Sequence, residues 1–462
     1  MKKCRLVTIL IGCLALLTLG PAATTHGDPP VPDPSLLGPF AVGHMSIMLT
    51  DPSRPCDRGD RPIPVEIFYP VDPSDVTDSS AQAVYPLDPI NGVWPTTHSS
   101  DWEVYGHDRA YEALPASAQK PFALVLFSPG WGGPIWGHNF LAVRAASHGF
   151  VVAVMYHYGD AFFLGEQFDH IAVASLNRPL DLSFVLTQLL FRNSTAGDTL
   201  YDLIDPTRVA ASGWSLGGFA AMALAGGVDN LGYNTESELY PWEPPPPPET
   251  YVPIPRDPRI KSIVPLDGSN QMMQFFELAR VTVPAMGMGQ EWSTLEGLGW
   301  GYPWESWQAR QHAAFQGHPS YRIDVAQAYH PSFSNLCTSI TLAHDHGLLT
   351  EEEFDAMASW LCSAPLATGE ANRVITKYWI AFLKKNLCRV QGYQHYLTPG
   401  YVLANEPGLE FFVTEKRNPG SIEDKWPDYF IYFKHQPGSE TARAEENPMT
   451  PMRHPHLGLP RD

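Results

Sequence analysis

Basic residues are scarce in this chain of 462 residues, in which 30 Lys and Arg stand against 49 Asp and Glu, so that the formal net charge is −19. A chain this acidic repels nucleic-acid backbones and anionic membrane surfaces, and we therefore expect no nucleic acid among its partners. Only 17% of the residues are charged and 44% are hydrophobic, which is typical of a globular protein and excludes a disordered one. The length allows one large domain with insertions.

Long apolar runs are absent except at the N-terminus. Residues 1–27 combine a basic start, an apolar stretch over 6–19 and small residues after it, which is the layout of a secretory signal peptide. The stretch is short for a membrane span, so we expect a secreted or periplasmic protein with no stable membrane span. The sequence LIGC at 10–13 also fits lipoprotein cleavage, but that cut would leave apolar residues 14–19 on the mature protein.

Cysteine is rare as well, with six residues, of which two lie in the predicted leader. The others are Cys56, Cys337, Cys362 and Cys388. An even number in an exported protein indicates disulfide bonds. Because the last three are close in sequence, we expect Cys362 to pair with Cys337 or with Cys388; buried reduced thiols are the alternative.

From residue 121 onward, short apolar segments alternate with helical patterns. The apolar segments are 122–130, 150–157, 208–215, 260–267, 283–290 and 321–330, and the helical patterns cover 139–149, 178–193, 217–227 and 372–387. Apolar strands that alternate with helices predict an α/β protein with a mostly parallel central sheet and helices on both faces. Ahead of them, 41–49 and 64–70 read as two strands of a meander, with a polar turn between them.

The composition also predicts the domain organisation. A Pro-rich linker over 28–37 precedes one catalytic domain over 38–415, and an irregular, polar, Pro-rich extension follows over 416–462. Within the domain, residues 71–120 read as long surface loops. The segment 229–259 reads as an insertion, because it contains the sequence WEPPPPPETYVPIPRDP, whose proline run favours an extended, exposed chain.

The segment RVAASGWSLGGFAAMALAGG places Ser215 between a predicted strand and a predicted helix. A G-x-S-x-G motif in this context predicts a nucleophile elbow, in which the serine takes a strained backbone conformation. Gly213 and Gly217 would leave room for the turn, and Gly218 would let the helix pack closely on the sheet. The N–H of Leu216 would lie at the helix N-terminus, where negative charge is favoured. An incidental serine in a tight strand–helix turn is the alternative.

A serine nucleophile needs a base, an acid that orients the base, and donors for the oxyanion. The sequence LFSPGWGG follows the first apolar strand of the α/β region, and we expect the N–H of Trp131 to act with that of Leu216 as oxyanion donors; a simple glycine-rich turn is the alternative. His330 follows the strand over 321–330 at its carboxyl end, where the base has to lie. His312 and His318 precede that strand and lie at its other end.

Two residues compete for the role of the acid, because both end a predicted strand. Asp267 ends the strand IKSIVPLD, and Glu291 ends the next strand in GMGQEWST. We favour Asp267, since its shorter side chain fixes an imidazole with less slack, although either carboxylate could belong to a turn. His344 and His346 form a lone pair that is weak evidence for a metal, and we expect no metal and no organic cofactor.

With these motifs in this order, the chain resembles the platelet-activating factor acetylhydrolase branch of the dienelactone-hydrolase-related α/β hydrolases. The resemblance rests on GPFAVG…LTDPSR…PVEIFYP, LFSPGWGG, RPLDLSFVLTQLL, GWSLGG, IVPLDG, AYHPSF and YLTP. It implies an α/β-hydrolase fold with Ser215 as nucleophile, His330 as base, Asp267 as acid, and Trp131 and Leu216 as oxyanion donors. Related polyester hydrolases take an aspartate after the next strand, where this chain reads GQEWST and has none. The Pro-rich insertion departs from the family pattern.

The sequence therefore predicts a secreted serine hydrolase that cleaves carboxylic esters, either lipid or short-chain acyl esters, through an acyl-enzyme. Its partner would be a small-molecule ester or lipid substrate. A peptidase or amidase on the same fold is one alternative, since the fold serves both reactions. A catalytically silent, hydrolase-like binding module is another, because a fold does not establish an activity.

Overall fold

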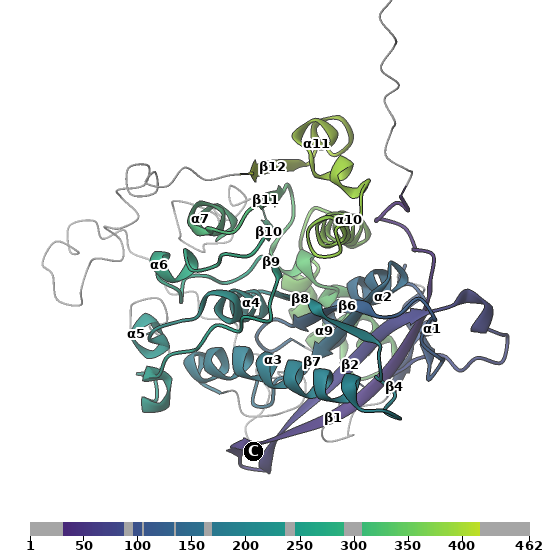
Figure 1. Ribbon diagram of the computed structural model, residues 1–462, viewed down its shortest axis with the longest axis horizontal. Helices are drawn as coiled ribbons and strands as arrows, with labels where there is room; N and C mark the ends of the chain where they lie inside the picture. Colours follow the sequence, from purple (N-terminus) through teal and green to yellow (C-terminus); the bar gives the residue numbers. More distant parts are fainter. Residues whose placement is uncertain are drawn as a thin grey trace, which may run out of the picture.

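The computed structural model describes most of the chain, and the ranges that it covers are 31–86, 96–103, 106–133, 135–160, 169–235, 245–290 and 307–415. The predicted leader, the middle of the predicted insertion, the extension over 416–462 and Glu291 lie outside these residues. Figure 1 shows how the described elements are arranged.

A ten-stranded sheet forms the centre of the molecule. In order across the sheet, its strands are β12 (Leu409–Thr414), β11 (Ser320–Val325), β10 (Ala285–Gln290), β9 (Ser262–Leu266), β8 (Ile204–Trp214), β6 (Phe122–Ser128), β7 (Phe150–Met155), β2 (Gly59–Val71), β1 (Ala41–Cys56) and β5 (Tyr111–Glu112). The six central strands, β7, β6, β8, β9, β10 and β11, run parallel to one another. β2 and β12 flank them in the antiparallel direction, and β1 pairs antiparallel with β2. This sheet confirms the predicted α/β architecture.

Helices cover both faces of the sheet. They are α1 (Ser99–Glu103), α2 (Asn139–Ser147), α3 (Ile171–Ser194), α4 (Leu216–Gly226), α5 (Leu231–Thr235), α6 (Phe275–Leu278), α7 (Trp307–Ala314), α8 (Leu336–Asp345), α9 (Glu351–Leu361), α10 (Thr368–Asn386) and α11 (Pro399–Asn405). Short 3-10 helices are η1 (Pro73–Asp75), η2 (Ile135–His138), η4 (Pro248–Tyr251), η6 (His330–Phe333) and η7 (Tyr393–Leu397). Figure 1 shows α2 and α10 on one side of the sheet and α3 and α4 on the other.

The central strands are apolar along their whole length because both of their faces are covered. In β6 every residue is buried. Val125 and Phe127 pack into the cluster that contains α2 and α10, whereas Leu124 and Leu126 pack into the cluster that contains α3 and α4. Alternate side chains of one strand thus enter two separate cores, as the side-chain period of a strand requires.

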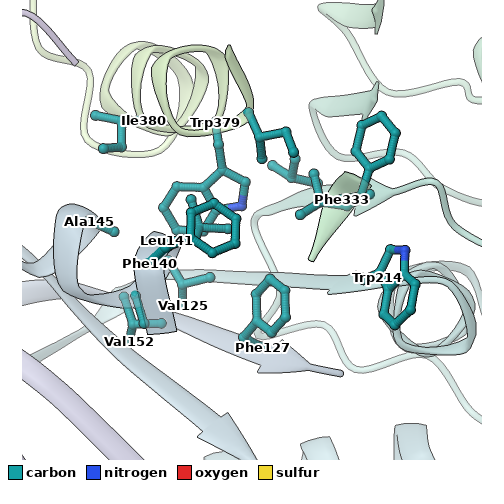
Figure 2. Packing of buried hydrophobic residues seen from close by; sticks show 14 of the residues in the cluster. Val125, Phe127, Phe140, Leu141, Ala145, Val152, Trp214, Phe333, Trp379 and Ile380 are labelled. Carbon is teal, nitrogen blue, oxygen red and sulfur yellow. The ribbon is translucent and has the colours of Figure 1, made fainter. Parts of the chain in front are cut away.

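The core on the α2 and α10 side extends to the carboxyl end of the sheet. Figure 2 shows Trp379 of α10 next to Phe140 and Leu141, with Phe127 and Trp214 farther along the strands. Trp214 is the last residue of β8 and is buried. It therefore connects the apolar core to the turn that contains Ser215.

The structure corrects several predicted boundaries. β1 continues to Cys56 and β2 begins at Gly59, so that most residues of the predicted turn lie in strands, with an irregular register between Asp51 and Cys56. α3 begins at Ile171, ahead of the predicted start at 178, and contains Pro179 in its interior. α8, α9 and β12 were not predicted from the sequence.

Two loop regions are also more ordered than the sequence predicted. The range 71–120 contains β3 (Val84–Pro86), β4 (Thr96–His98), α1 and β5, and it buries Tyr85 and Trp102. In the insertion, η4 and α5 contact each other, and the apolar side chains of Leu231 and Ile254 are buried in the core on the α3 and α4 side. Apolar side chains therefore anchor both regions to the core.

A disulfide bond joins Cys337 of α8 to Cys362, which directly follows α9. This is one of the two predicted pairings. Cys56 and Cys388 are unbridged among the cysteines that the structure describes. Within the described ranges, none of the helices has both the length and the apolar character that crossing a bilayer would require.

Candidate active site

Ser215 lies in a sharp turn between β8 and α4. Its backbone angles are φ 56° and ψ −121°, which a residue with a side chain adopts only under strain. Two neighbouring segments hold the turn: the N–H of Ser215 donates to the carbonyl of Leu266 at 3.0 Å, and the N–H of Ser269 donates to the carbonyl of Ser215 at 2.9 Å. Ser215 is thereby fixed beside the carboxyl end of β9.

Three glycines make this turn possible. A Cβ on Gly213 would lie 2.4 Å from the carbonyl carbon of Gly217, and a Cβ on Gly217 would lie 1.9 Å from the carbonyl oxygen of Ser128. A Cβ on Gly218 would lie 2.5 Å from Cα of Gly268. Backbone contacts this close exclude any larger residue at the three positions; those at Gly213 and Gly217 are with the turn itself and with the end of β6 and not with the side chain of Ser215.

Asp267 directly follows β9, and its side chain is completely buried. Its Oδ2 accepts hydrogen bonds from Nδ1 of His330 at 2.5 Å and from Nε2 of Gln290 at 2.8 Å. Its Oδ1 accepts from Nε2 of Gln308 at 3.2 Å. A buried carboxylate held by these donors has one orientation, and in that orientation it fixes the imidazole of His330.

His330 begins η6 after the end of β11. Its carbonyl accepts a hydrogen bond from Nε1 of Trp214 at 3.0 Å, and the two rings have centroids 4.8 Å apart. Because Trp214 precedes Ser215 in the chain, these contacts bring the imidazole to the turn that contains the serine. His312 and His318 instead lie near Thr414, at the other end of β11.

Gln290 and Gln308 were not predicted from the sequence. Gln290 ends β10 and so lies at the carboxyl end of a strand, next to the predicted rival acid in the sequence. Its position was therefore a usable signal. Gln308 lies in α7, after residues that the structure does not describe, and nothing in its sequence surroundings marks it.

The two predicted oxyanion donors lie on segments that meet at the turn. Leu216 is the first residue of α4. Trp131 lies in the loop 129–133, its side chain is 36% exposed, and a Cβ on the preceding Gly130 would lie 2.3 Å from the ring of Trp214. The loop 129–133 thus packs directly against the residue that precedes Ser215.

A second hydrogen-bonded set of a serine, a histidine and an aspartate lies next to this loop. The hydroxyl of Ser128 is 2.8 Å from Nε2 of His157, whose Nδ1 is 2.9 Å from Oδ2 of Asp181. All three side chains are buried, and Nη1 of Arg178 donates to the Ser128 hydroxyl at 3.1 Å. A hydroxyl buried in the sheet and held in this way cannot meet a substrate. The hydrogen-bonded set of Ser128, His157 and Asp181 therefore has a structural role, and no feature of the sequence predicted it.

Burial and neighbouring charges shift the pKa values of Asp181 and His157 in this second hydrogen-bonded set. Burial alone would raise the pKa of Asp181, but Arg61, His157 and Arg54 together hold it far below its usual range. Burial, and next the charge of Arg178, lower the pKa of His157. The imidazole is consequently neutral, donates from Nδ1 to Asp181, and accepts from Ser128.

In the ranges that the structure describes, no group of three or more His, Cys, Asp or Glu side chains is arranged to hold a metal ion. Hydroxyl, imidazole, carboxylate and backbone N–H groups are the chemical groups gathered at the turn. Such a set is suited to nucleophilic attack on a carbonyl carbon and to stabilising the negative charge that forms on its oxygen.

Comparison with known proteins bears on the fold. No protein-family model matches the sequence, and no curated protein matches it. Among solved structures, a ferulic acid esterase from Streptomyces cinnamoneus is similar, with a TM-score of 0.54 and 19% sequence identity over 81% of this chain and 96% of that one. The strand order, the strand–turn–helix at Ser215 and this similarity identify the fold of the chain as the α/β-hydrolase fold.

Proposed function

We propose that this protein is a serine hydrolase of carboxylic esters. The observation that carries the proposal is the 2.5 Å hydrogen bond between Asp267 and His330, beside the strained turn of Ser215. The ferulic acid esterase of similar fold supports an ester as the substrate class. Within that class, the resemblance to platelet-activating factor acetylhydrolases favours lipid or short-chain acyl esters.

In the proposed reaction, Oγ of Ser215 attacks the ester carbonyl carbon while Nε2 of His330 takes the hydroxyl proton. The oxyanion of the tetrahedral intermediate is stabilised by the N–H groups of Leu216 and Trp131. The carbon–oxygen bond of the ester then breaks, and the alcohol leaves with the proton from His330. Asp267 keeps Nδ1 protonated and stabilises the imidazolium.

A water molecule completes the cycle. It loses a proton to His330 and attacks the acyl carbon, and the acid leaves as Ser215 recovers the proton. The same imidazole thus acts as a base and then as an acid in each half of the reaction.

We expect Ser215→Ala to lower kcat for p-nitrophenyl acetate and p-nitrophenyl butyrate by at least about 10³-fold, because no other described group at the turn supplies the nucleophile. Ser212→Ala is the matched control, since that serine lies on the same strand and bonds the Val264 carbonyl and Trp379. It should keep the wild-type rate. Equal rates for wild type and Ser215→Ala would remove the proposal.

Fluorophosphonate labelling followed by peptide mapping distinguishes an active serine hydrolase from a protein of the same fold with an inactive site. We expect the label on Ser215, which is partly exposed, and none on Ser128, which is buried. A protein that takes no label has a silent site. Cleavage of a peptide library together with inertness towards esters would reassign the bond to an amide.

A further inference from the structure

The loop 129–133, which contains the proposed oxyanion donor Trp131, packs on one side against the nucleophile turn. A Cβ on Gly217 would lie 1.9 Å from the carbonyl oxygen of Ser128 and 2.5 Å from that of Pro129. The ring of Trp214 fills the space next to Gly130. These contacts limit where the loop lies, but they do not set the direction of its peptide groups.

Arg178 of α3 holds the other side of the loop. Its guanidinium is buried and donates from Nη2 to the carbonyl of Gly130 at 2.9 Å, and from Nη1 to the carbonyl of Pro129. Nη1 also reaches the hydroxyl of Ser128 at 3.1 Å, and Nε donates to Asp160. One planar group thus binds consecutive residues of the loop, which the fixed geometry of its donors allows.

Two hydrogen bonds to the Gly130 carbonyl determine where the N–H of Trp131 points: one from Arg178, and one from the backbone N–H of Gly133 at 2.9 Å. The peptide between these two residues is trans, and the C=O and N–H of a planar trans peptide point in opposite directions. Because Arg178 draws the Gly130 carbonyl toward α3, the N–H of Trp131 is directed away from α3. Arg178 therefore helps to set the orientation of the proposed donor, together with the turn bond from Gly133.

Asp160 fixes the next residue of the loop. Its Oδ1 accepts from the N–H of Gly132 at 3.0 Å, and Gly132 has φ 70°, which favours glycine. The same carboxylate pairs with Arg178 through Oδ2. Both charges are buried, and burial of an ion pair is by itself weak evidence of stabilisation. The effect of these contacts is to fix the conformation of the loop 129–133.

We propose that Arg178, together with Asp160, is a positioning residue that directs the N–H of Trp131 at the forming oxyanion. The proposal rests on the proposed function, because it presupposes that an oxyanion forms at Ser215. It adds a role for two residues that touch neither the substrate nor Ser215.

The variant Arg178→Lys tests this role. A lysine ammonium keeps the charge but cannot hold the carbonyls of Pro129 and Gly130 and the carboxylate of Asp160 at once. We expect kcat for p-nitrophenyl butyrate to fall about 10²-fold, the lower end of the cost of losing an oxyanion donor, while KM stays near the wild-type value. Affinity for phenylboronic acid, whose tetrahedral serine adduct places a hydroxyl at the oxyanion position, should fall by a similar factor.

Arg61→Lys is the matched control. Arg61 is equally buried and donates from Nε and Nη2 to Asp181 at 3.0 Å and from Nη2 to the carbonyl of Tyr158 at 3.0 Å. Its substitution should destabilise the fold and change kcat far less than Arg178→Lys does, because its bonds reach the loop 129–133 only indirectly, through Asp181, His157 and Ser128. A loss of kcat in Arg61→Lys as large as that in Arg178→Lys would overturn the proposal, since general destabilisation would then explain both.

A second variant covers the case in which Arg178→Lys does not fold. Asp160→Asn keeps an acceptor for the N–H of Gly132 but loses the charge opposite Arg178, and we expect a fall in kcat of about tenfold with KM unchanged. Full activity and full boronate affinity in either folded variant would overturn the positioning role. That outcome leaves the proposed function intact, because it is decided separately by the difference between wild type and Ser215→Ala.

Discussion

Asp267 combines a strained backbone with a complete set of hydrogen bonds. Its φ is 40°, in a region that costs a residue with a side chain about 1 kcal/mol or more. The carboxylate that this conformation presents is buried and bonded to His330, Gln290 and Gln308. Strain of this kind is concentrated at functional sites, and here it lies at the residue that holds the imidazole.

The exchange Asp267→Asn keeps the size of the side chain but offers Nδ1 of His330 an amide that favours the wrong tautomer. We expect kcat to fall by about 10⁴-fold, measured with p-nitrophenyl acetate. Asp324→Asn is the control, because Asp324 is a buried carboxylate that pairs with Arg322 on β11, two strands away from β9. A loss of less than about tenfold in Asp267→Asn, combined with a large loss in Glu291→Gln, would transfer the role to Glu291.

At the residue scale, the sequence predicted best the side chains that follow strands. Ser215, Asp267 and His330 each follow an apolar run, so their common edge of the sheet could be inferred before their contacts were known. Arg178 and Asp160 could not be inferred in this way. Their pairing depends on how α3 packs beneath the loop 129–133, and no spacing in the sequence encodes that packing.

At the scale of elements, strands buried on both faces were predicted correctly because they are continuous apolar runs. Strands whose extent depends on pairing with a partner strand were not predicted to their full length. β6 and β7 are buried throughout and read as apolar runs. The hairpin of β1 and β2 was predicted too short, because its polar residues and prolines resemble a turn until the partner strand is known. α9 carried a signal that was missed: Thr350 and Glu353 form a capping box at its start.

The disulfide between Cys337 and Cys362 ties α8 to the end of α9, and α9 in turn contacts η6, where His330 lies. It closes a loop with a sequence separation of 25 residues, for which the chain-entropy estimate is about 3.5 kcal/mol of stabilisation. We expect the double variant Cys337→Ala/Cys362→Ala to lose about this much free energy of unfolding, measured in urea. Dithiothreitol should lower the midpoint of the wild type and leave that of the variant unchanged.

The matched control for this bond is Cys56→Ala/Cys388→Ala, which removes the unbridged cysteines of the described chain. It should still respond to dithiothreitol as the wild type does. If the reductant shifted the wild-type midpoint but not that of this control, the bond would join different cysteines.

At the scale of the whole molecule, buried imidazoles determine how many protons are taken up on unfolding. Burial lowers the pKa of His107 to about 4, of His138 to about 3 and of His148 to about 4. His44 behaves in the opposite way. Burial opposes its charge, but hydrogen bonds to Glu112 and Glu66 outweigh that effect and raise its pKa to about 9.

These shifts predict a maximum of stability near neutral pH. Below about pH 6.5 the unfolded chain protonates these three imidazoles and that of His157, whose pKa burial also lowers, so stability falls until about pH 4. Near pH 5 the slope should reach about 5 kcal/mol per pH unit. Above about pH 6.5 the stabilisation from charged His44 decreases and is lost through about pH 9.

Urea unfolding at several pH values checks this prediction. The variant His107→Phe, whose new ring would lie against Trp102 and Phe140, should reduce the acid slope by about one quarter, since one of four protons is removed. A free energy of unfolding that stays constant between about pH 6.5 and pH 5 would contradict the assignment of neutral buried imidazoles.

The backbone contacts at Gly213, Gly217 and Gly218 also have a consequence for directed evolution. Every substitution at these positions introduces a Cβ into space that another backbone already occupies. Mutant libraries that randomise them would consist largely of defective clones, whatever substrate is used for selection. Positions such as Trp131, where a side chain already reaches solvent, offer the tolerance to sequence change from which a new substrate range could be selected.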